Sequence, residues 1–471
     1  MDILIINPGK IRHDYITEHL GIASLKSYAC LKGFKAETLD MAIEEISVRD
    51  VVNRIMSIMP KSVGVSLLDD SQTKGLYLIQ ELRRSGYQGH IIVGGYFATF
   101  SSKEILRDFP EINFVVRGEG EFTLVELLSA LFLDTEYPFT NILGLSFRKN
   151  EQIIENPSRP LIKNLDILPP VDRKYAHTVL TKGSHLRIFG TRGCWGQCSF
   201  CDIINMYGSS PGKAWRFRSI GNLVDEIELL MKKFGTDYFI FNDDQFLLKG
   251  SRGQKRAEEF AEELERRKLK IHFELMCRAD IIHRQTMRRL KAVGLHCIFL
   301  GLESFDEKQL QRFRKRISVR QNLKALITLY QLKIDVVVSV ILADAFTTLK
   351  DLVRQFIFLF ELRRRYFNSP NCQISINRKV ELYRGSALYS DYKARGLLTN
   401  DHYLGKFYYK LNLWTHFRLK LFDLETALSR ILLKPTYTLK NVMKALCWQL
   451  NQMKSYLLLN KKGNFFLKLR D

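Results

Sequence analysis

Three cysteines in one short run constrain this chain more than any other feature of its sequence. Cys194, Cys198 and Cys201 form a C-x3-C-x2-C pattern. A loop with these gaps can place three thiolates around one cuboidal [4Fe–4S] cluster, and the neighbourhood has no fourth cysteine to complete the cage. One iron is therefore expected to stay open, and an open coordination position distinguishes a site that binds a small molecule from a closed structural site.

The remaining cysteines are scattered singly in apolar settings: Cys30, Cys277, Cys297, Cys372 and Cys447. This distribution is typical of buried free thiols in a reducing compartment. Two alternatives for the clustered cysteines are a tetrahedral zinc site and three unrelated core thiols. Zinc would need a fourth ligand at short spacing and its usual paired C-x2-C motifs.

Residues 1–133 alternate strand and helix patterns, which predicts a doubly wound, Rossmann-like α/β domain. Two glycine-rich segments, at 94–95 and 118–120, follow the last two strands, and ligands bind at this carboxyl edge of such sheets. The last expected helix is Phe122–Phe132. The expected strands are Asp2–Ile6, Lys35–Leu39, Val63–Ser66, His90–Val93 and Asn113–Val116.

A proline-marked passage over residues 134–183 is unsuited to a long helix or a central strand and is predicted to be an interdomain linker. Residues 184–395 return to βα alternation, and six strands predict a partial barrel with the cysteine loop directly after its first strand. These strands are expected at His185–Gly190, Asp237–Phe241, Ile271–Leu275, His296–Leu300, Asp335–Ile341 and Gln373–Ile376.

The cysteine run, with Arg192-Gly193 before it and Phe200 before its third cysteine, resembles the signature of radical S-adenosylmethionine (SAM) enzymes. That resemblance implies a (β/α)6 barrel in which Cys194, Cys198 and Cys201 hold the cluster and SAM chelates the open iron.

Later barrel loops resemble the SAM-contacting segments of the same family. By that resemblance, Phe200 belongs to the cofactor site, Asp243 and Asp244 accept hydrogen bonds from the SAM ammonium, and Arg278 meets the SAM carboxylate. Glu303 and Ser304 are implied to contact the ribose or the methionine end. Taken alone, the acidic loop could also be a solvated turn, and Glu303 a charge at a helix N-terminus.

The two glycine-rich loops of the first domain resemble those of B12-binding domains fused to radical SAM enzymes. The resemblance implies that Gly94, Gly95, Gly118, Glu119 and Gly120 help to bind cobalamin. The D-x-H-x-x-G motif is absent, so any cobalamin should lack a histidine ligand from that motif. The alternative is a Rossmann-like domain that binds nothing.

Two further loops of the barrel resemble family segments that face the substrate, and they suggest Asp344 and Tyr383 as catalytic residues. Both loops depart from the family pattern, with Ala345 and Arg384 where the family tends to have proline. After the cysteine loop, Arg216 and Arg218 are candidates for contacts with cofactor phosphates or the cluster, or are structural arginines.

The chain carries a formal net charge of +22, which favours an anionic partner. Residues 396–471 are expected to form a basic helical region, with helices near Leu411–Leu433 and Leu439–Leu459. This region either caps the barrel or meets an anionic surface. No RNA-binding module is recognised, so no specific nucleic acid is predicted. No signal peptide or long apolar stretch is seen, so we expect a cytoplasmic location.

The family resemblance implies cleavage of SAM to a 5′-deoxyadenosyl radical by the reduced cluster, with electrons from a donor such as flavodoxin or ferredoxin. The first functional hypothesis is cobalamin-dependent methylation of an unactivated carbon, or of phosphorus, in a small-molecule or natural-product precursor. The second is a non-methylating dehydratase, cyclase or rearrangement enzyme with a structural N-terminal domain. The third is a membrane- or nucleic-acid-associated iron-sulfur binding protein without turnover.

Overall fold

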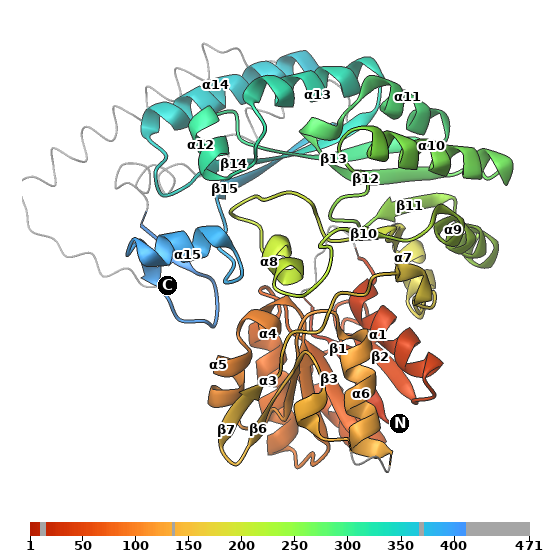
Figure 1. Cartoon of the computed structure of the whole chain (residues 1–471), viewed down its shortest axis with the longest axis vertical. Helices are drawn as coiled ribbons and strands as arrows, with labels where there is room; N and C mark the ends of the chain where they lie inside the picture. The colour runs from red at the N-terminus through yellow and green to blue at the C-terminus, as the bar shows by residue number, and fades with distance from the viewer. Residues whose placement is uncertain (10–15, 134–136, 367–371, 411–471) are drawn as a thin grey trace, which may run out of the picture.

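The computed structural model describes residues 1–9, 16–133, 137–366 and 372–410. These residues form two α/β units stacked one above the other, with helix α8 (Ile203–Gly208) and its adjoining loops between them (Figure 1). The N-terminal unit is drawn in red and orange, and the cysteine loop lies at its junction with the second unit.

The first unit is built on a seven-stranded sheet in the order β2-β1-β3-β4-β5-β6-β7. Its first five strands are parallel, and the five strands predicted from the sequence are confirmed. The strands are β1 (Ile3–Asn7), β2 (Ala36–Asp40), β3 (Ser62–Ser66), β4 (His90–Gly94), β5 (Phe114–Val116), β6 (Leu145–Lys149) and β7 (Gln152–Glu155).

Alternating apolar side chains explain why helices cover both faces of this sheet. In β1, Ile3 and Ile5 share a core with α1 and α6, whereas Leu4 and Ile6 share a core with α2 to α5. The helices are α1 (Leu20–Leu31), α2 (Val48–Ile58), α3 (Gln72–Arg84), α4 (Tyr96–Phe100), α5 (Ser102–Asp108) and α6 (Gly120–Phe132).

The sheet continues past the predicted domain boundary at residue 133, because β6 and β7 lie within the stretch expected to be a linker. Both strands pair antiparallel at one edge of the sheet, and β7 is largely half-exposed. As an edge strand, β7 has no fully buried side chain, so its sequence lacks the continuous apolar run that marks β1 and β5. The passage to the second unit carries η1 (Phe139–Asn141), η2 (Leu165–Ile167) and α7 (Ala176–Thr181).

The second unit is a six-stranded parallel sheet in the order β15-β14-β13-β12-β11-β8, so strands adjacent in the chain are adjacent in space. All six predicted strands are confirmed. They are β8 (Leu186–Ile188), β11 (Tyr238–Phe241), β12 (His272–Arg278), β13 (Leu295–Glu303), β14 (Asp335–Ala343) and β15 (Gln373–Lys379).

Helices pack on the outer face of this sheet, away from the first unit (Figure 1). A short hairpin of β9 (Thr191–Arg192) and β10 (Arg216–Phe217) brackets the cysteine loop. The helices are α9 (Ile220–Phe234), α10 (Ser251–Arg266), η3 (Ala279–Ile281), α11 (Arg284–Ala292), α12 (Glu307–Arg312), α13 (Val319–Gln331) and α14 (Leu349–Tyr366).

After β15 the chain forms α15 (Ala387–Ala394) and the short strands β16 (Leu398–Asn400) and β17 (Tyr408–Tyr409). This segment returns to the first unit, where Tyr403 stacks on Phe97 of α4 at 6.2 Å between ring centroids. The two predicted basic helices at 411–433 and 439–459 lie outside the described residues. Among the residues described here, no helix is long and apolar enough to cross a membrane.

Candidate functional site

The cysteine loop leaves the carboxyl end of β8 and is anchored on the connection between α12 and α13. Cys198 is buried, and Cys194 and Cys201 are partly buried. The backbone N–H of Ser199 donates to the carbonyl oxygen of Phe313 at 2.8 Å, and the Ser199 hydroxyl donates to the preceding carbonyl at 2.8 Å. These two bonds fix the position of Cys198 relative to the second sheet.

Gly193, just before the first cysteine, allows the loop to pass close to another backbone segment. Its φ is +80°, and a Cβ placed there would lie 2.0 Å from the carbonyl oxygen of Ala214. Any side chain would force the two segments apart, which explains the glycine at this position.

The three thiols fit a cluster better than a single metal ion. Within the described residues, no three His, Cys, Asp or Glu side chains are grouped so that they could hold one ion. A [4Fe–4S] cluster binds each thiolate to a different iron, so its ligands need not converge on a single point. Burial raises the pKa of Cys194 and of Cys201, and the interaction of each with Cys198 raises it further. Iron binding would offset this cost of ionisation.

The two adjacent aspartates after β11 occupy different positions. The Oδ1 atom of Asp243 accepts hydrogen bonds from the N–H groups of Gly190 and Thr191, both at 2.8 Å, and this side chain is fully buried. Asp244 accepts from the N–H of Gly193 at 3.2 Å and lines the cavity between the units. Burial raises the pKa of Asp243 to about 7 and of Asp244 to about 6. Of these two aspartates, Asp244 is therefore the one that a ligand in the cavity would contact.

Arg278, at the end of β12, lies directly against the cysteine loop. Its Nη1 contacts the Sγ of Cys198 at 3.4 Å, its Nη2 donates to the carbonyl oxygen of Lys315 at 2.7 Å, and its Nε donates to Asp280 at 3.0 Å. The guanidinium also stacks over Trp195 at 4.9 Å. Its predicted role in binding the SAM carboxylate stays a prediction, because in this structure the guanidinium holds the cysteine loop.

Glu303 is the last residue of β13 and Ser304 follows it, but their side chains have different partners. Glu303 Oε1 accepts from Nζ of Lys315 at 2.8 Å, and both side chains are buried. The Ser304 hydroxyl donates to Gln309 at 2.5 Å and is fully buried in the protein interior. Ser304 therefore supports the α12 region, and its contact with SAM stays a prediction.

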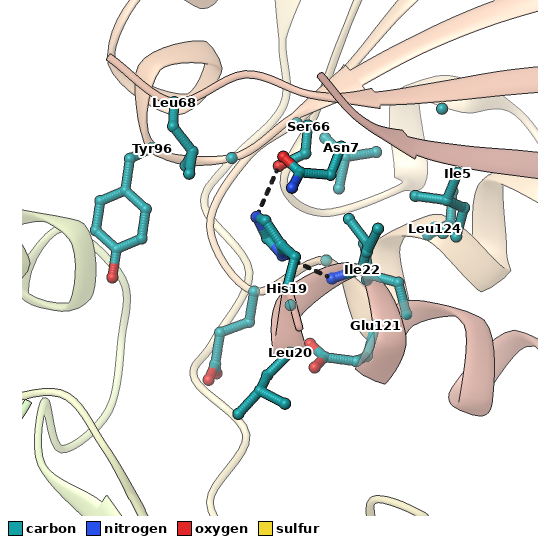
Figure 2. Close-up of a pocket in the computed structure, with 18 of the residues that line it drawn as sticks. Ile5, Asn7, His19, Leu20, Ile22, Ser66, Leu68, Tyr96, Glu121 and Leu124 are labelled. Atoms are coloured by element: carbon teal, nitrogen blue, oxygen red, sulfur yellow. Dashed lines mark hydrogen bonds between the residues drawn. The ribbon is translucent and has the colours of Figure 1, made fainter. Parts of the chain in front are cut away.

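A cavity of about 490 Å³ lies between the carboxyl ends of the two sheets. Its volume is within the range of roughly 300–1,000 Å³ that is usual for ligand sites. Figure 2 shows the part of its wall that the first unit contributes, where apolar residues such as Ile5 and Leu124 lie beside polar residues such as Asn7. The apolar wall includes Ile5, Ile22, Ile92 and Leu124, and the polar wall includes Arg187, Asn242, Asp244 and Tyr207.

The predicted cobalamin-binding residues Gly94, Gly95, Gly118, Glu119 and Gly120 all line this cavity. Gly95 has a φ of +97°, and a Cβ there would meet the carbonyl oxygen of Leu67 at 2.7 Å. The glycines keep the backbone edge bare, as a large flat ligand requires, and an apolar recess extends beyond them into the first unit. These features fit a corrin ring.

Glu119 is the centre of a buried ionic network that joins the two units. Its carboxylate accepts from Nη1 of Arg192 at 3.0 Å, from Nη1 of Arg216 at 2.7 Å and from the N–H of Ile162 at 2.8 Å. Arg192 also pairs with Glu121 at 2.6 Å. Glu119 and Arg216 thus hold the first unit against the cysteine loop. This agrees with the structural alternative for Arg216, and the contact of Glu119 with cobalamin stays a prediction.

Among the lining residues that sequence reasoning missed are His19 and Tyr96 (Figure 2). Nδ1 of His19 accepts from the N–H of Ile22 at 3.2 Å, and Nε2 lies 3.5 Å from the hydroxyl of Ser66. Burial lowers the pKa of His19, so the ring is neutral near pH 7. The sequence feature that could have identified His19 is its position just before α1, which begins with Leu20-Gly21.

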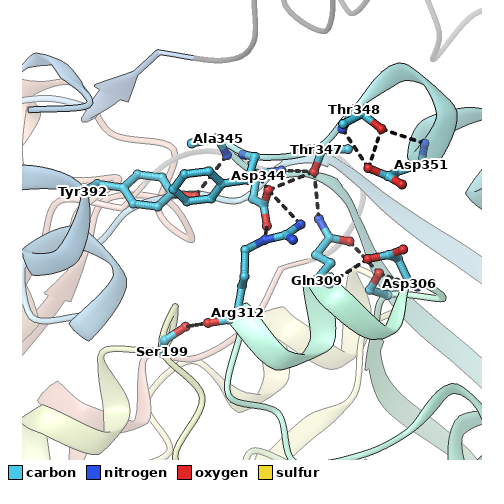
Figure 3. Close-up of polar contacts among 12 residues, drawn as sticks. Ser199, Asp306, Gln309, Arg312, Asp344, Ala345, Thr347, Thr348, Asp351 and Tyr392 are labelled. Carbon is cyan, nitrogen blue, oxygen red and sulfur yellow. Dashed lines mark hydrogen bonds and ion pairs between the residues drawn. The ribbon is translucent and has the colours of Figure 1, made fainter. Parts of the chain in front are cut away.

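Asp344 belongs to a polar cluster on the second unit rather than to the cavity wall (Figure 3). Its carboxylate pairs with Nε and Nη2 of Arg312 at 2.6 and 3.1 Å, and Oδ1 also accepts from the hydroxyl of Thr347 at 3.0 Å. Asp344 is 1% exposed. These contacts give it a structural role at the end of β14, and a direct contact with substrate finds no support.

Three other predicted residues are also engaged within the protein. The Tyr383 hydroxyl donates to Glu381 at 3.1 Å, and burial together with that carboxylate raises the pKa of Tyr383. Phe200 packs edge-on against Phe313 with ring centroids 5.2 Å apart, and this contact supports the cysteine loop. Arg218 pairs with buried Glu226 and is structural.

Comparisons with known proteins match this division into two units. Residues 10–128 match the B12 binding domain model, and residues 188–354 match the radical SAM superfamily model. An uncharacterized methyltransferase of Pyrococcus horikoshii is 28% identical over 66% of this chain and 66% of its own length. The anaerobic magnesium-protoporphyrin IX monomethyl ester cyclase of Rubrivivax gelatinosus is 27% identical over 61% of this chain and 52% of its own length.

The chain thus spans about half to two thirds of the length of these curated relatives. Among solved structures, the cobalamin-dependent SAM radical enzyme OxsB, with aqua-cobalamin and SAM bound, superimposes with a TM-score of 0.73 at 18% identity, covering 96% of this chain and 70% of that one. The radical SAM domain implies a [4Fe–4S] cluster and SAM, and the B12-binding domain implies cobalamin. The chain belongs to the radical SAM enzymes that carry a B12-binding domain.

Proposed function

We propose that this protein methylates an unactivated carbon, or phosphorus, of a small-molecule precursor, using SAM and cobalamin. The observation that carries the proposal is the single cavity whose wall contains both the bare glycine loops of the first unit and Asp244 of the second. Similarity to a methyltransferase of Pyrococcus horikoshii supports methyl transfer as the outcome.

The side chains have separate tasks in this proposal. Cys194, Cys198 and Cys201 would hold the cluster, and Asp244 would accept hydrogen bonds from the SAM ammonium. Gly94, Gly95, Gly118 and Gly120 would let the corrin ring approach the backbone, and the buried network around Glu119 would keep water out of the junction. When bound, the reduced cluster supplies the electron that cleaves SAM to the 5′-deoxyadenosyl radical, and cobalamin carries the methyl group.

The geometry does not favour a contact with substrate or cofactor for three of the predicted residues. Asp344 and Ser304 make complete sets of protein contacts away from the cavity, and Tyr383 pairs with Glu381. The proposed substrate is a small molecule that enters the space bounded by Asp244, Tyr96 and Tyr207, and the proposed reductant is a flavodoxin or ferredoxin.

The experiment uses anaerobically prepared protein supplied with cobalamin, iron and SAM bearing a deuterated methyl group. Iron, corrinoid and 5′-deoxyadenosine are measured for each chain, followed by a substrate screen for incorporated label. About four irons and stoichiometric corrinoid, with labelled product, support the proposal. Cys198→Ala is the negative control, and Cys30→Ala, which changes an exposed cysteine outside the loop, is the matched positive control.

A second candidate is a non-methylating cyclisation or rearrangement, favoured by the similarity to the magnesium-protoporphyrin cyclase. It predicts 5′-deoxyadenosine and a modified substrate without transfer of the deuterated methyl group. Iron binding with no 5′-deoxyadenosine under any reducing condition would instead indicate an iron-sulfur protein without turnover, and both enzymatic proposals would fail.

A further inference from the structure

Lys315 is a buried cation beside the cysteine loop, and no role was predicted for it from the sequence. It stands in the run Arg314-Lys315-Arg316, and only the middle residue is buried, at 4% exposure. Both flanking arginines have left-handed backbone, with φ of +48° and +55°. Left-handed backbone is unfavourable for arginine, so this turn carries a conformational cost. The turn places the side chain of Lys315 inside the protein.

The turn is held directly against the cysteine loop. Arg278 bridges the two, since its Nη2 donates to the carbonyl oxygen of Lys315 at 2.7 Å and its Nη1 contacts the Cys198 Sγ at 3.4 Å. One residue beyond Cys198, the backbone N–H of Ser199 donates to the carbonyl oxygen of Phe313. Arg278 therefore joins the backbone of Lys315 to the sulfur of Cys198.

The partner of Lys315 is also held in an unusual conformation. Glu303 has a φ of +66°, and the pairing of β13 with β14 shifts register between Gly301 and Glu303. The carboxylate folds back over Gly301, where a Cβ would lie 2.7 Å from Glu303 Oε1 and 3.1 Å from Lys315 Nζ. The pair therefore depends on a glycine, a register shift and three left-handed residues, far more than an ordinary buried ion pair requires.

Charge on this lysine is maintained in spite of its burial. Burial opposes the charged form, but the charge of the Glu303 carboxylate and its hydrogen bond favour it, and the pKa of Lys315 lies above its ordinary value. A positive charge close to an iron-sulfur cluster stabilises the reduced state, because reduction adds negative charge to the cluster.

We infer that the Lys315–Glu303 ion pair sets the reduction potential of the cluster held by Cys194, Cys198 and Cys201. Lys315 raises the potential, Glu303 limits that effect, and Arg278 holds both near Cys198. Lys315 is a positioning and electrostatic residue, acting through the cluster. The inference rests on the cluster binding of the proposed function, but not on methyl transfer or cobalamin.

The test is a potentiometric titration followed by electron paramagnetic resonance, on full-length protein with reconstituted cluster and without SAM. Lys315→Met should shift the midpoint potential to a more negative value. Glu303→Gln should shift it to a more positive value, since it removes a negative charge and leaves the lysine in place. Lys315→Arg should restore the potential toward that of the wild type, and Arg314→Met, at the exposed neighbour, should leave it unchanged.

Opposite shifts in the two variants are the expected result, and a purely structural ion pair would not produce them. Equal shifts, or none, in variants that keep the iron content of the wild type would overturn the inference. Iron loss from Lys315→Met that Lys315→Arg reverses would show the same dependence on charge, whereas iron loss from both would overturn it. Wild-type protein that binds no cluster would instead refute the proposed function itself.

Discussion

At the scale of single residues, Cys198 differs from the cysteines outside its loop by the charge around it. Arg278 contacts its sulfur, and Lys315 lies nearby. We expect Cys198→Ala to reduce iron from about four per chain to well under one, because two thiolates cannot retain the cluster. Iron and sulfide analysis measures the change. Cys30→Ala should keep the iron content of the wild type, and equal loss in both variants would contradict a specific site.

The buried carboxyl of Asp243 should make the stability of the protein depend on pH. Its pKa rises from 3.8 to about 7 because burial opposes the charged form. Stability from the protonated carboxyl is fully present below the unfolded pKa and is lost as pH rises through about 7. Asp243→Asn keeps an acceptor for Gly190 and Thr191. Its stability relative to wild type should therefore grow between about pH 4 and pH 7, toward roughly 4 kcal/mol.

Urea denaturation of the two proteins without cofactors, repeated across that pH range, measures the difference. A constant difference between wild type and Asp243→Asn would show that the buried carboxyl does not titrate in this interval.

The sequence identified residue types better than their partners. The cysteines, Asp244 and the glycines follow strand ends, and strand order alone brings such positions to one edge. Glu119 and Asp344 follow strand ends too, but arginines distant in sequence occupy their carboxylates. Pairing of that kind depends on three-dimensional packing, which no local pattern records.

At the scale of secondary-structure elements, the β9–β10 hairpin ties the two units together through Arg192 and Arg216. Arg192→Met would leave Glu119 and Glu121 short of a partner in a buried setting. Removing one member of a buried pair costs about 3–5 kcal/mol. We expect a loss of that size in the free energy of unfolding, measured by chemical denaturation.

Lys232→Met is the matched control, because Lys232 pairs with Glu228 on the exposed face of α9. Surface pairs contribute less than about 1 kcal/mol. A small effect from both substitutions would mean that the hairpin does not hold the units together.

Elements with a regular pattern of apolar residues were predictable from the sequence, and strands β6 and β7 were not. Strands β1, β3 and β5 are wholly buried and largely apolar, so the doubly wound pattern was evident. Strand β7 has no buried residue and lies close to Pro157, and the pairing of β6 to β5 arises from tertiary contact.

At the scale of the whole molecule, the cavity belongs to neither unit alone. Cobalamin should therefore slow hydrogen exchange in both units, at Gly94–Tyr96 and Gly118–Glu121 in the first and around Tyr207 and Asn242–Asp244 in the second. Helix α13 lies on the outer face and serves as an internal control. Mass spectrometry of protein with and without cobalamin measures the change, and protection confined to residues 1–133 would exclude the second unit from the site.

The network around Glu119 also limits how this protein can be recombined with its relatives. A chimera that joined this first unit to another barrel would place Glu119 and Glu121 against a foreign surface. Unless the grafted barrel supplied arginines at the positions of Arg192 and Arg216, two buried carboxylates would face no counter-charge. Domain shuffling is thus permitted only between halves that have kept the same charges at their junction.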